Sequence, residues 1–254
     1  MEILDLQPHQ VGPLERIGSR NDGGYVIPQW LPEKMTLISF GVGDNWSFEK
    51  NCLEKKIVSN SIMFDHTVGL GVFLSRIQLR LLAKNFAIKP LLYRILVAMR
   101  YVRDFSHKSL IHVKKEITSD LNSENKTNLL DVVKNLEITR FILKVDIEGA
   151  EYEIMEQIVL LNKKIPVLLI EFHETEKRRQ SFEESLQLLK KSFILAHTHA
   201  NNYSGLSRDG IPRTVELTFC NRDYYVAEKA VLELPVDGLD QASAPDRPDI
   251  YLKF

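Results

Sequence analysis

The sequence predicts an α/β fold, a doubly wound and mostly parallel sheet of seven strands. Three observations predict it. Short apolar or β-branched runs recur along the chain, segments of helical periodicity separate most of them, and glycine or polar residues follow the ends of the runs. Strands that alternate with helices build a parallel sheet covered on both faces. At 254 residues the chain is long enough for one such domain with a sizeable core.

Seven runs are expected to be strands. They lie at 36–43, 61–68, 111–118, 141–147, 166–174, 193–200 and 214–226. The expected helices between them are 46–58, 128–136, 151–164 and 181–192. The last strand follows its predecessor with no room for a helix, so we expect it to be antiparallel. Ligands of such sheets bind beyond the carboxyl ends of the strands, where this chain places its polar residues.

The charge of the chain is unevenly distributed. With 33 Lys and Arg against 34 Asp and Glu, the net charge is −1. Residues 71–115 hold ten basic side chains and one acidic one, Asp104, hence a charge of +9, which leaves −10 for the rest. Arg76, Arg80 and Lys84 recur every four residues and share one helix face. A second basic helix, 91–103, follows Pro90.

Three interpretations remain open for this basic helical insertion, residues 69–110. The favoured one is a solvated face of helices that cap the sheet. The others are a membrane-surface helix pair that meets anionic lipid through residues 71–103, and a lid that recognises an anionic glycan. Nucleic acid is not expected as a partner, because the rest of the chain is acidic and no aromatic-basic platform is evident.

Composition narrows the class of protein further. The apolar content of 44% excludes a disordered chain. The two cysteines, Cys52 and Cys220, have no metal-type or redox-type spacing, which indicates a reducing compartment. The first residues lack a signal-peptide pattern, and no window of about 18 residues is apolar enough to span a membrane. We therefore expect one cytoplasmic domain (1–254) with an N-terminal cap segment (1–35), and with peripheral contact at the inner face of a membrane under the second interpretation above.

A glycine turn, GVGDN (41–45), follows the first predicted strand. Glycines let the backbone approach a ligand closely, and the next helix offers its N–H groups to it. Asp65 ends the second strand about twenty residues on, where a carboxylate can accept the hydroxyls of a ribose. A plain turn and a helix cap are the structural alternatives. Together the two features favour a nucleoside cofactor, either a dinucleotide or S-adenosylmethionine. The third glycine of a dinucleotide-binding motif is missing, which makes the dinucleotide the weaker hypothesis.

Acids and histidines follow the next strands. Asp146 ends the fourth strand, and Lys144 lies just inside it, where an unpaired charge is costly, so we expect a salt bridge between Lys144 and a nearby acid. Glu171 and His173 follow the fifth strand and His199 ends the sixth. The favoured chemistry is a histidine base, held by a carboxylate, that removes a hydroxyl proton. The less favoured one is a divalent metal bound by Asp146, Glu171 and His173 or His199.

These motifs together resemble the FkbM-type family of S-adenosylmethionine-dependent methyltransferases. The segments that carry the resemblance are RIGSRNDGGYVIP (16–28), SFGVGDNWSFE (39–49), FDHTV (64–68), LKVDIEGAE (143–151), LLIEFHE (168–174) and HTHANN (197–202). They extend over nearly the whole chain, and LKVDIEGAE is the most specific. The resemblance implies a Rossmann-like class I methyltransferase fold and O-methylation of a sugar hydroxyl.

The resemblance also implies roles for individual residues. Gly41, Gly43 and Asp44, with Asn45 beside them, bracket the methionine part of S-adenosylmethionine, and Asp65 takes the ribose hydroxyls. Asp146 lies beside the sulfonium and the acceptor.

Other positions are less defined by the resemblance. Asp22 and Tyr25 lie at a D-G turn, for which a hairpin or lid turn is favoured and contact with the cofactor is the alternative. The basic insertion departs from the family pattern, so the adenine contact falls to Glu116 or to Ser119 and Asp120.

We therefore expect an S-adenosylmethionine-dependent O-methyltransferase of polysaccharide biosynthesis. Its acceptor is a carbohydrate: a polysaccharide, a lipid-linked glycan or a nucleotide sugar, including anionic ones. Asp146, Glu171, His173 and His199 are expected to position and deprotonate the acceptor. The alternative is a non-catalytic, membrane-associated partner in a glycan pathway that keeps the methyltransferase fold. An NAD-dependent enzyme is a third and weaker hypothesis.

Overall fold

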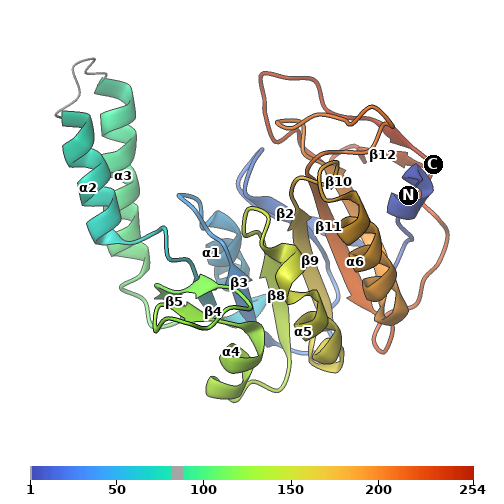
Figure 1. The fold of residues 1–254 in the computed structure, drawn as a ribbon, viewed down its shortest axis with the longest axis horizontal. Coiled ribbons are helices and arrows are strands. Elements are labelled where there is room, and N and C mark those ends of the chain that lie inside the picture. The colour runs from blue at the N-terminus through green and yellow to red at the C-terminus, as the bar shows by residue number, and fades with distance from the viewer. Residues whose placement is uncertain (1, 82–87) are drawn as a thin grey trace.

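The computed structural model describes residues 2–81 and 88–254. A seven-stranded sheet with helices on both faces forms its centre, and two long helices project from one end (Figure 1). The strands of this sheet are β3 (Met35–Phe40), β4 (Val58–Phe64), β5 (Leu110–Val113), β8 (Phe141–Val145), β9 (Val167–Phe172), β10 (Phe193–Ala200) and β11 (Val215–Asn221). The helices are α1 (Ser47–Glu54), α2 (Leu70–Leu81), α3 (Ile88–Asp104), α4 (Leu129–Asn135), α5 (Met155–Leu160) and α6 (Arg179–Ser192).

Shorter elements complete the structure. They are the strand pairs β1 (Leu14–Gly18) with β2 (Gly24–Pro28), β6 (Glu116–Ile117) with β7 (Lys126–Thr127) and β12 (Glu233–Leu234) with β13 (Leu252–Lys253), and the 3₁₀ turns η1 (Ile3–Leu6), η2 (Glu151–Ile154) and η3 (Asn162–Lys164). Lys84, which we expected on the first basic helix, lies outside the described residues.

The order of the strands identifies the fold. Across the sheet it is β10-β11-β9-β8-β3-β4-β5, which is 6-7-5-4-1-2-3 when the seven strands are numbered along the chain. The pairings of β3, β4, β5, β8 and β9 with one another are parallel, whereas β11 is antiparallel to both β9 and β10. This confirms the doubly wound, mostly parallel sheet and its reversed last strand. The order is that of the Rossmann-like class I methyltransferase fold.

Two hydrophobic cores lie on opposite faces of the sheet. Successive strand residues point to opposite faces, so Ile38 and Leu143 enter one core and their neighbours Leu37 and Ile142 the other. The helices α4, α5 and α6 cover the first face (Figure 1). The second face is covered by α1 together with the β1–β2 hairpin. Both faces of the central strands are therefore buried, as the near-continuous apolar runs predict.

Two predicted elements end differently in the structure. The strand expected at 111–118 stops at Val113, and a separate two-residue strand, β6, follows after Lys114 and Lys115. The helix expected at 151–164 is divided into η2, α5 and η3. Its first turn is tightened because the fully buried Glu151 accepts hydrogen bonds from the backbone N–H groups of Ile147 and Gly149.

The basic insertion is a hairpin of α2 and α3 whose described residues pack on the sheet at its base. Phe73, Val97 and Ala98 are buried there against Trp46 and Met63. The hairpin then extends away from the sheet (Figure 1). Among the described residues, no helix has the length and apolarity needed to cross a membrane.

A buried carboxylate at the end of α3 fixes the base of this hairpin. Asp104 accepts hydrogen bonds from Trp46 Nε1 (3.0 Å), Lys50 Nζ (3.1 Å) and Arg103 Nε (2.8 Å). Burial raises the pKa of Asp104, but these three donors outweigh it and hold the pKa well below its usual range. The single acid of the basic segment is therefore an anchor.

Replacing Asp104 by Asn should lower the free energy of unfolding by about 1–3 kcal/mol, because charge-assisted hydrogen bonds are lost in a buried place. Urea unfolding followed by circular dichroism measures the change. Asp246→Asn, at an exposed position, is the matched control and should be neutral. Equal stability of both variants would show that Asp104 does not anchor the hairpin.

Candidate active site

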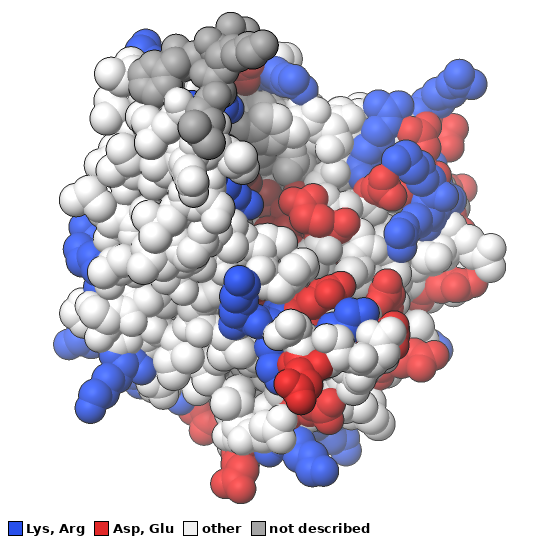
Figure 2. Space-filling view, turned by 60° about the vertical axis from the view of Figure 1, so that its left-hand side comes forward, with Lys and Arg blue, Asp and Glu red and all other residues white. Residues whose placement is uncertain are grey.

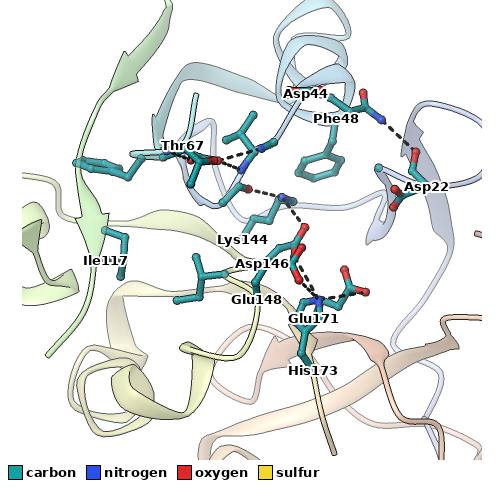
Figure 3. A pocket seen from close by; sticks show the side chains of 18 of the residues that line it. Asp22, Asp44, Phe48, Thr67, Ile117, Lys144, Asp146, Glu148, Glu171 and His173 are labelled. Carbon is teal, nitrogen blue, oxygen red and sulfur yellow. Dashed lines mark hydrogen bonds and ion pairs between the residues drawn. The ribbon is translucent and has the colours of Figure 1, made fainter. Parts of the chain in front are cut away.

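One pocket lies at the carboxyl ends of β3, β4, β8 and β9, with a cavity volume of about 660 Å³ (Figure 3). This is within the range of about 300–1,000 Å³ that small-molecule sites have. Ten of the eleven site residues expected from the sequence line it, and His199 is the exception. The ten are Asp22, Tyr25, Gly41, Gly43, Asp44, Asn45, Asp65, Asp146, Glu171 and His173.

The glycine loop after β3 packs closely on one side and is open on the other. Gly41 has a φ of 76°, and a Cβ there would lie 1.5 Å from the backbone oxygen of Asp146, so only glycine fits. Gly43 has a φ of 58°, and no heavy atom lies within 4 Å of where its Cβ would be. The loop therefore leaves open space beside the backbone of Gly43, just before the N-terminus of α1.

Asp65 holds the shape of this loop. Its Oδ2 accepts hydrogen bonds from Val42 N and Gly43 N (both 3.0 Å), and its Oδ1 accepts from the N and Oγ1 of Thr67 (both 2.7 Å). Burial raises the pKa of Asp65, but these donors outweigh it and lower the pKa. About four lone-pair positions are available on a carboxylate, and all are used. The expected ribose contact stays a prediction, and it would have to replace one of these bonds.

Lys144 joins the glycine loop to the acids. Its buried Nζ donates to the backbone oxygen of Gly41 (2.9 Å), and lies 3.6 Å from Asp146 Oδ2 and 3.7 Å from Glu49 Oε1. It also lies 4.8 Å from the centre of the Tyr25 ring. Burial lowers the pKa of Lys144, but the negative charges of Glu49 and Asp146 outweigh it and raise the pKa. The expected salt bridge is confirmed, whereas Glu49, which lies within α1, was not anticipated.

The turn of the β1–β2 hairpin forms one wall of the pocket. Asn45 Nδ2 donates to the backbone oxygen of Asp22 (3.1 Å) and to Ser19 Oγ (2.9 Å), which ties this turn to the glycine loop. Tyr25 Oη donates to Asp146 Oδ2 (2.9 Å). Burial, together with the charges of Glu216 and Asp146, raises the pKa of Asp22. The segment is thus both the hairpin that we favoured and a part of the pocket.

Asp146, Glu171 and His173 converge at the floor of the pocket (Figure 3). His173 Nε2 lies 3.9 Å from Asp146 Oδ1, 3.9 Å from Glu171 Oε1 and 3.5 Å from Glu148 Oε2. One ligand atom from each of Asp146, Glu171 and His173 lies within 4.8 Å of the other two. This donor set fits a divalent cation as well as it fits proton transfer.

The second nitrogen of His173 is held by Glu151, with 2.7 Å between Nδ1 and Oε1. Burial lowers the pKa of His173, but the hydrogen bond to Glu151 and the charge of Glu171 outweigh it and raise the pKa to about 9. The imidazole is therefore protonated at neutral pH. Glu151 is therefore the residue that orients the histidine.

Glu171 belongs to a row of charged residues across three strands. Glu216 of β11 is its direct cross-strand partner, and His199 of β10 is the partner of Glu216 on the other side. Burial and the charges of Asp146 and Glu216 raise the pKa of Glu171 well above its usual value. Asn201 Nδ2 donates to Glu171 Oε1 (2.9 Å). Glu216 and Asn201 were not predicted as site residues.

His199 is not brought to the pocket, because β11 lies between β9 and β10. Its Nδ1 lies 3.4 Å from Glu216 Oε2, and its Nε2 lies 3.8 Å from Asp249 Oδ1. Burial lowers the pKa of His199, but the charge of Glu216 and the contact with Asp249 outweigh it and raise the pKa to about 10. Its geometry is that of a buried ion pair. The loop that follows β10 still reaches the pocket, where Asn201 contacts Glu171, so the expectation that His199 itself joins the site is the part that was wrong.

The α2–α3 hairpin also contributes to the pocket. Arg76 Nη1 donates to Asp44 Oδ1 (3.0 Å), and Tyr93 of α3 is part of the lining. Of the adenine candidates, Glu116 lines the pocket beside Ile117, whereas Ser119 and Asp120 do not.

Comparison with known families supports the resemblance seen in the sequence. The family model described as "Methyltransferase FkbM domain" matches residues 106–203. This range includes Asp146, Glu171 and His173. No curated protein matches the chain.

Solved structures with similar folds are distant. They include M. capricolum TrmK in complex with S-adenosyl-homocysteine (13% identity, TM-score 0.41, covering 78% of this chain and 66% of that one). Another is spermidine synthase from Thermotoga maritima (14% identity, TM-score 0.41, covering 75% of this chain and 55% of that one). A third is the fibrillarin pre-rRNA processing protein of Methanococcus jannaschii (9% identity, TM-score 0.40, covering 76% of this chain and 70% of that one). The chain spans just under two thirds of the length of TrmK. The fold assignment rests on the strand order.

Replacing Glu151 by Gln should lower the pKa of His173 from about 9 toward the ordinary value of about 6.5, because a neutral amide stabilises the imidazolium less. An NMR titration of the His173 ring measures this directly. Glu156→Gln, at an exposed position of α5, is the control and should leave that pKa at about 9. The same pKa in both variants would contradict the orienting role of Glu151.

The protonation of His173 also affects the stability of the fold. The pKa of His173 is higher in the folded state than in the unfolded state, so its protonation stabilises the fold. This contribution is fully present below about pH 6.5 and is lost as the pH rises through about 9. The wild type should therefore lose more stability between those two pH values than Glu151→Gln does. Thermal unfolding as a function of pH measures the difference.

Proposed function

Since residues 106–203 match an FkbM methyltransferase domain and the sheet has the strand order of a class I methyltransferase, we propose that this chain is an S-adenosylmethionine-dependent O-methyltransferase. Its acceptor is a hydroxyl group of a carbohydrate. The observation that carries the proposal is that an open glycine loop and the Asp146, Glu171 and His173 cluster face one another in a single pocket.

The residues of the pocket fit this cofactor. S-adenosylmethionine supplies an electrophilic methyl group on a positively charged sulfur. The open backbone at Gly43 suits the methionine part, and Asp22 and Asp146 provide negative charge toward the sulfonium. Glu116 and Ile117 offer a polar and an apolar contact for the adenine.

The acceptor side of the pocket is suited to a sugar. Asn201, Ser204 and Thr214 supply hydrogen-bonding groups beside the acidic cluster. Tyr203, whose ring is half exposed, also lines this side and offers an aromatic face for a sugar ring. A polar wall with one exposed aromatic ring matches a ligand that has many hydroxyl groups and an apolar ring face.

In this proposal His173 is the base. Glu151 holds Nδ1, which leaves Nε2 directed at Asp146, Glu148 and Glu171. The neutral form of His173 accepts the proton of the attacking hydroxyl, while Asp146 and Glu171 orient that hydroxyl. The competing chemistry is a divalent cation held by Asp146, Glu171 and His173, which would polarise the hydroxyl oxygen. His199 has no role in either scheme because it lies outside the pocket.

Calorimetric titration with S-adenosylhomocysteine should show binding, and Asp65→Ala should weaken it by at least about tenfold, since the loop and the ribose contact both depend on that carboxylate. The control is Asp237→Ala, at an exposed position outside the pocket lining. Absence of wild-type binding at millimolar concentration would overturn the cofactor proposal. Equal affinity of Asp65→Ala would remove the ribose assignment.

The rate of methyl transfer should rise with pH to a midpoint near 9, because His173 must lose its proton before it acts as the base. Glu151→Gln should move that midpoint to lower pH. EDTA should leave the rate unchanged. Loss of activity with EDTA, restored by Mg²⁺ or Mn²⁺, would replace the base scheme by the metal scheme.

A further inference from the structure

The helix α3 exposes an apolar stripe to solvent. Its members recur every three or four residues, share one face, and are each 51–64% exposed: Ile88, Leu92, Leu96, Met99 and Val102. On α2, Leu70, Leu74 and Leu81 have the same kind of spacing and are 42–56% exposed. Helices on a protein surface normally turn such a stripe toward the core. Among the described residues of this hairpin, those that pack in the core against the sheet lie at its base.

The segment that carries the apolar stripe has a strongly positive charge in the sequence. The sequence has no acidic residue from position 70 to position 103 and seven basic ones, Arg76, Arg80, Lys84, Lys89, Arg94, Arg100 and Arg103. Figure 2 shows a broad white surface on the left, with blue side chains around its border. An apolar surface with a basic border is complementary to the interface of an anionic bilayer.

Three arginines of the hairpin gather around one hollow. Arg76, Arg80 and Arg94, with Leu79, line a cavity of about 300 Å³. Arg76 is paired with Asp44, whereas Arg80 and Arg94 have no hydrogen-bond or ion-pair partner among the described residues. Guanidinium groups match the geometry of a phosphate in two-pronged hydrogen bonds. The leucine of this lining is Leu79, and Arg94 lies two residues from both Leu92 and Leu96, so the hollow opens on a different side of α3 from the apolar stripe.

We propose that the α2–α3 hairpin docks on an anionic phospholipid bilayer, with its apolar stripe in the interfacial region and with Arg80 and Lys89, which adjoin apolar-stripe residues in the sequence, at the lipid phosphates. Charge complementarity selects this occupant over a second copy of the chain, because two such hairpins would bring like charges together. Tyr93 and Arg76 connect the hairpin to the pocket, so docking places the pocket beside the membrane surface. Resting on the proposed function, this selects a lipid-linked glycan as the acceptor.

Vesicle co-sedimentation tests the docking. The full chain should bind vesicles that contain phosphatidylcholine and phosphatidylglycerol in a ratio of about two to one. It should bind vesicles of phosphatidylcholine alone much more weakly. Binding to the mixed vesicles should weaken as the salt concentration rises. Equal binding to both kinds of vesicle, or to neither, overturns the proposal.

Two double variants test the two components of the surface. Arg80→Glu with Lys89→Glu should weaken binding to the mixed vesicles by more than about tenfold, since each basic residue near the surface contributes. Leu92→Ser with Leu96→Ser should weaken it by at least about tenfold through lost apolar burial. All four side chains are outside the core, so the fold should persist, and circular dichroism checks this.

The matched control is Lys34→Glu with Lys134→Glu. Both lysines are exposed and lie on other elements, before β3 and in α4. This variant changes the net charge by the same amount as the charge-reversal variant of the hairpin, and it should bind vesicles like the wild type. If it loses binding as fully as Arg80→Glu with Lys89→Glu, net charge and not the hairpin is responsible, which overturns the proposal.

Two further results separate the alternatives. Sedimentation velocity that shows a dimer dissociated by Leu92→Ser with Leu96→Ser, without vesicle binding, would assign the stripe to a second copy. Titration with S-adenosylhomocysteine tests the proposed function independently. Vesicle binding without cofactor binding would leave the docking surface and remove the methyltransferase, whereas the reverse result would remove only the docking.

Discussion

The buried charge of Lys144 is the interaction on which the pocket depends. Its ammonium group contacts the glycine loop through Gly41, the helix α1 through Glu49, the carboxyl end of β8 through Asp146 and the β1–β2 hairpin through Tyr25. A lysine is buried without large cost only when its partners surround it. Four segments that are distant in the sequence must therefore assemble together, and the geometry of the pocket follows from that requirement.

The architecture was predictable because each strand has its own local signal. Apolar runs with turn residues at their ends mark all seven strands, and the short connection from β10 to β11 requires the reversal. The predictions that were wrong concern details that depend on single contacts. The tight turn at Glu151 arises from two backbone hydrogen bonds to one side chain, and the end of β5 precedes two lysines. No periodicity in the sequence carries such information.

The site was predictable to the extent that strand ends determine it. Asp65, Asp146 and Glu171 follow or end strands and meet at one edge of the sheet. His199 also lies near a strand end, but the insertion of β11 separates it from the pocket, and strand order across a sheet is a property of tertiary structure. The high pKa of His173 is similarly collective, because it arises from carboxylates on several segments.

The row formed by Glu171 and Glu216 has a consequence for turnover. Two carboxylates placed opposite one another on neighbouring strands are costly to charge together, and burial and the charges of Asp146 and Glu216 accordingly raise the pKa of Glu171. A cationic ligand lowers that cost and a neutral one does not. Under the proposed reaction the sulfur loses its positive charge when the methyl group leaves. In that reaction, the same carboxylates therefore favour binding of the positively charged cofactor over binding of its uncharged product.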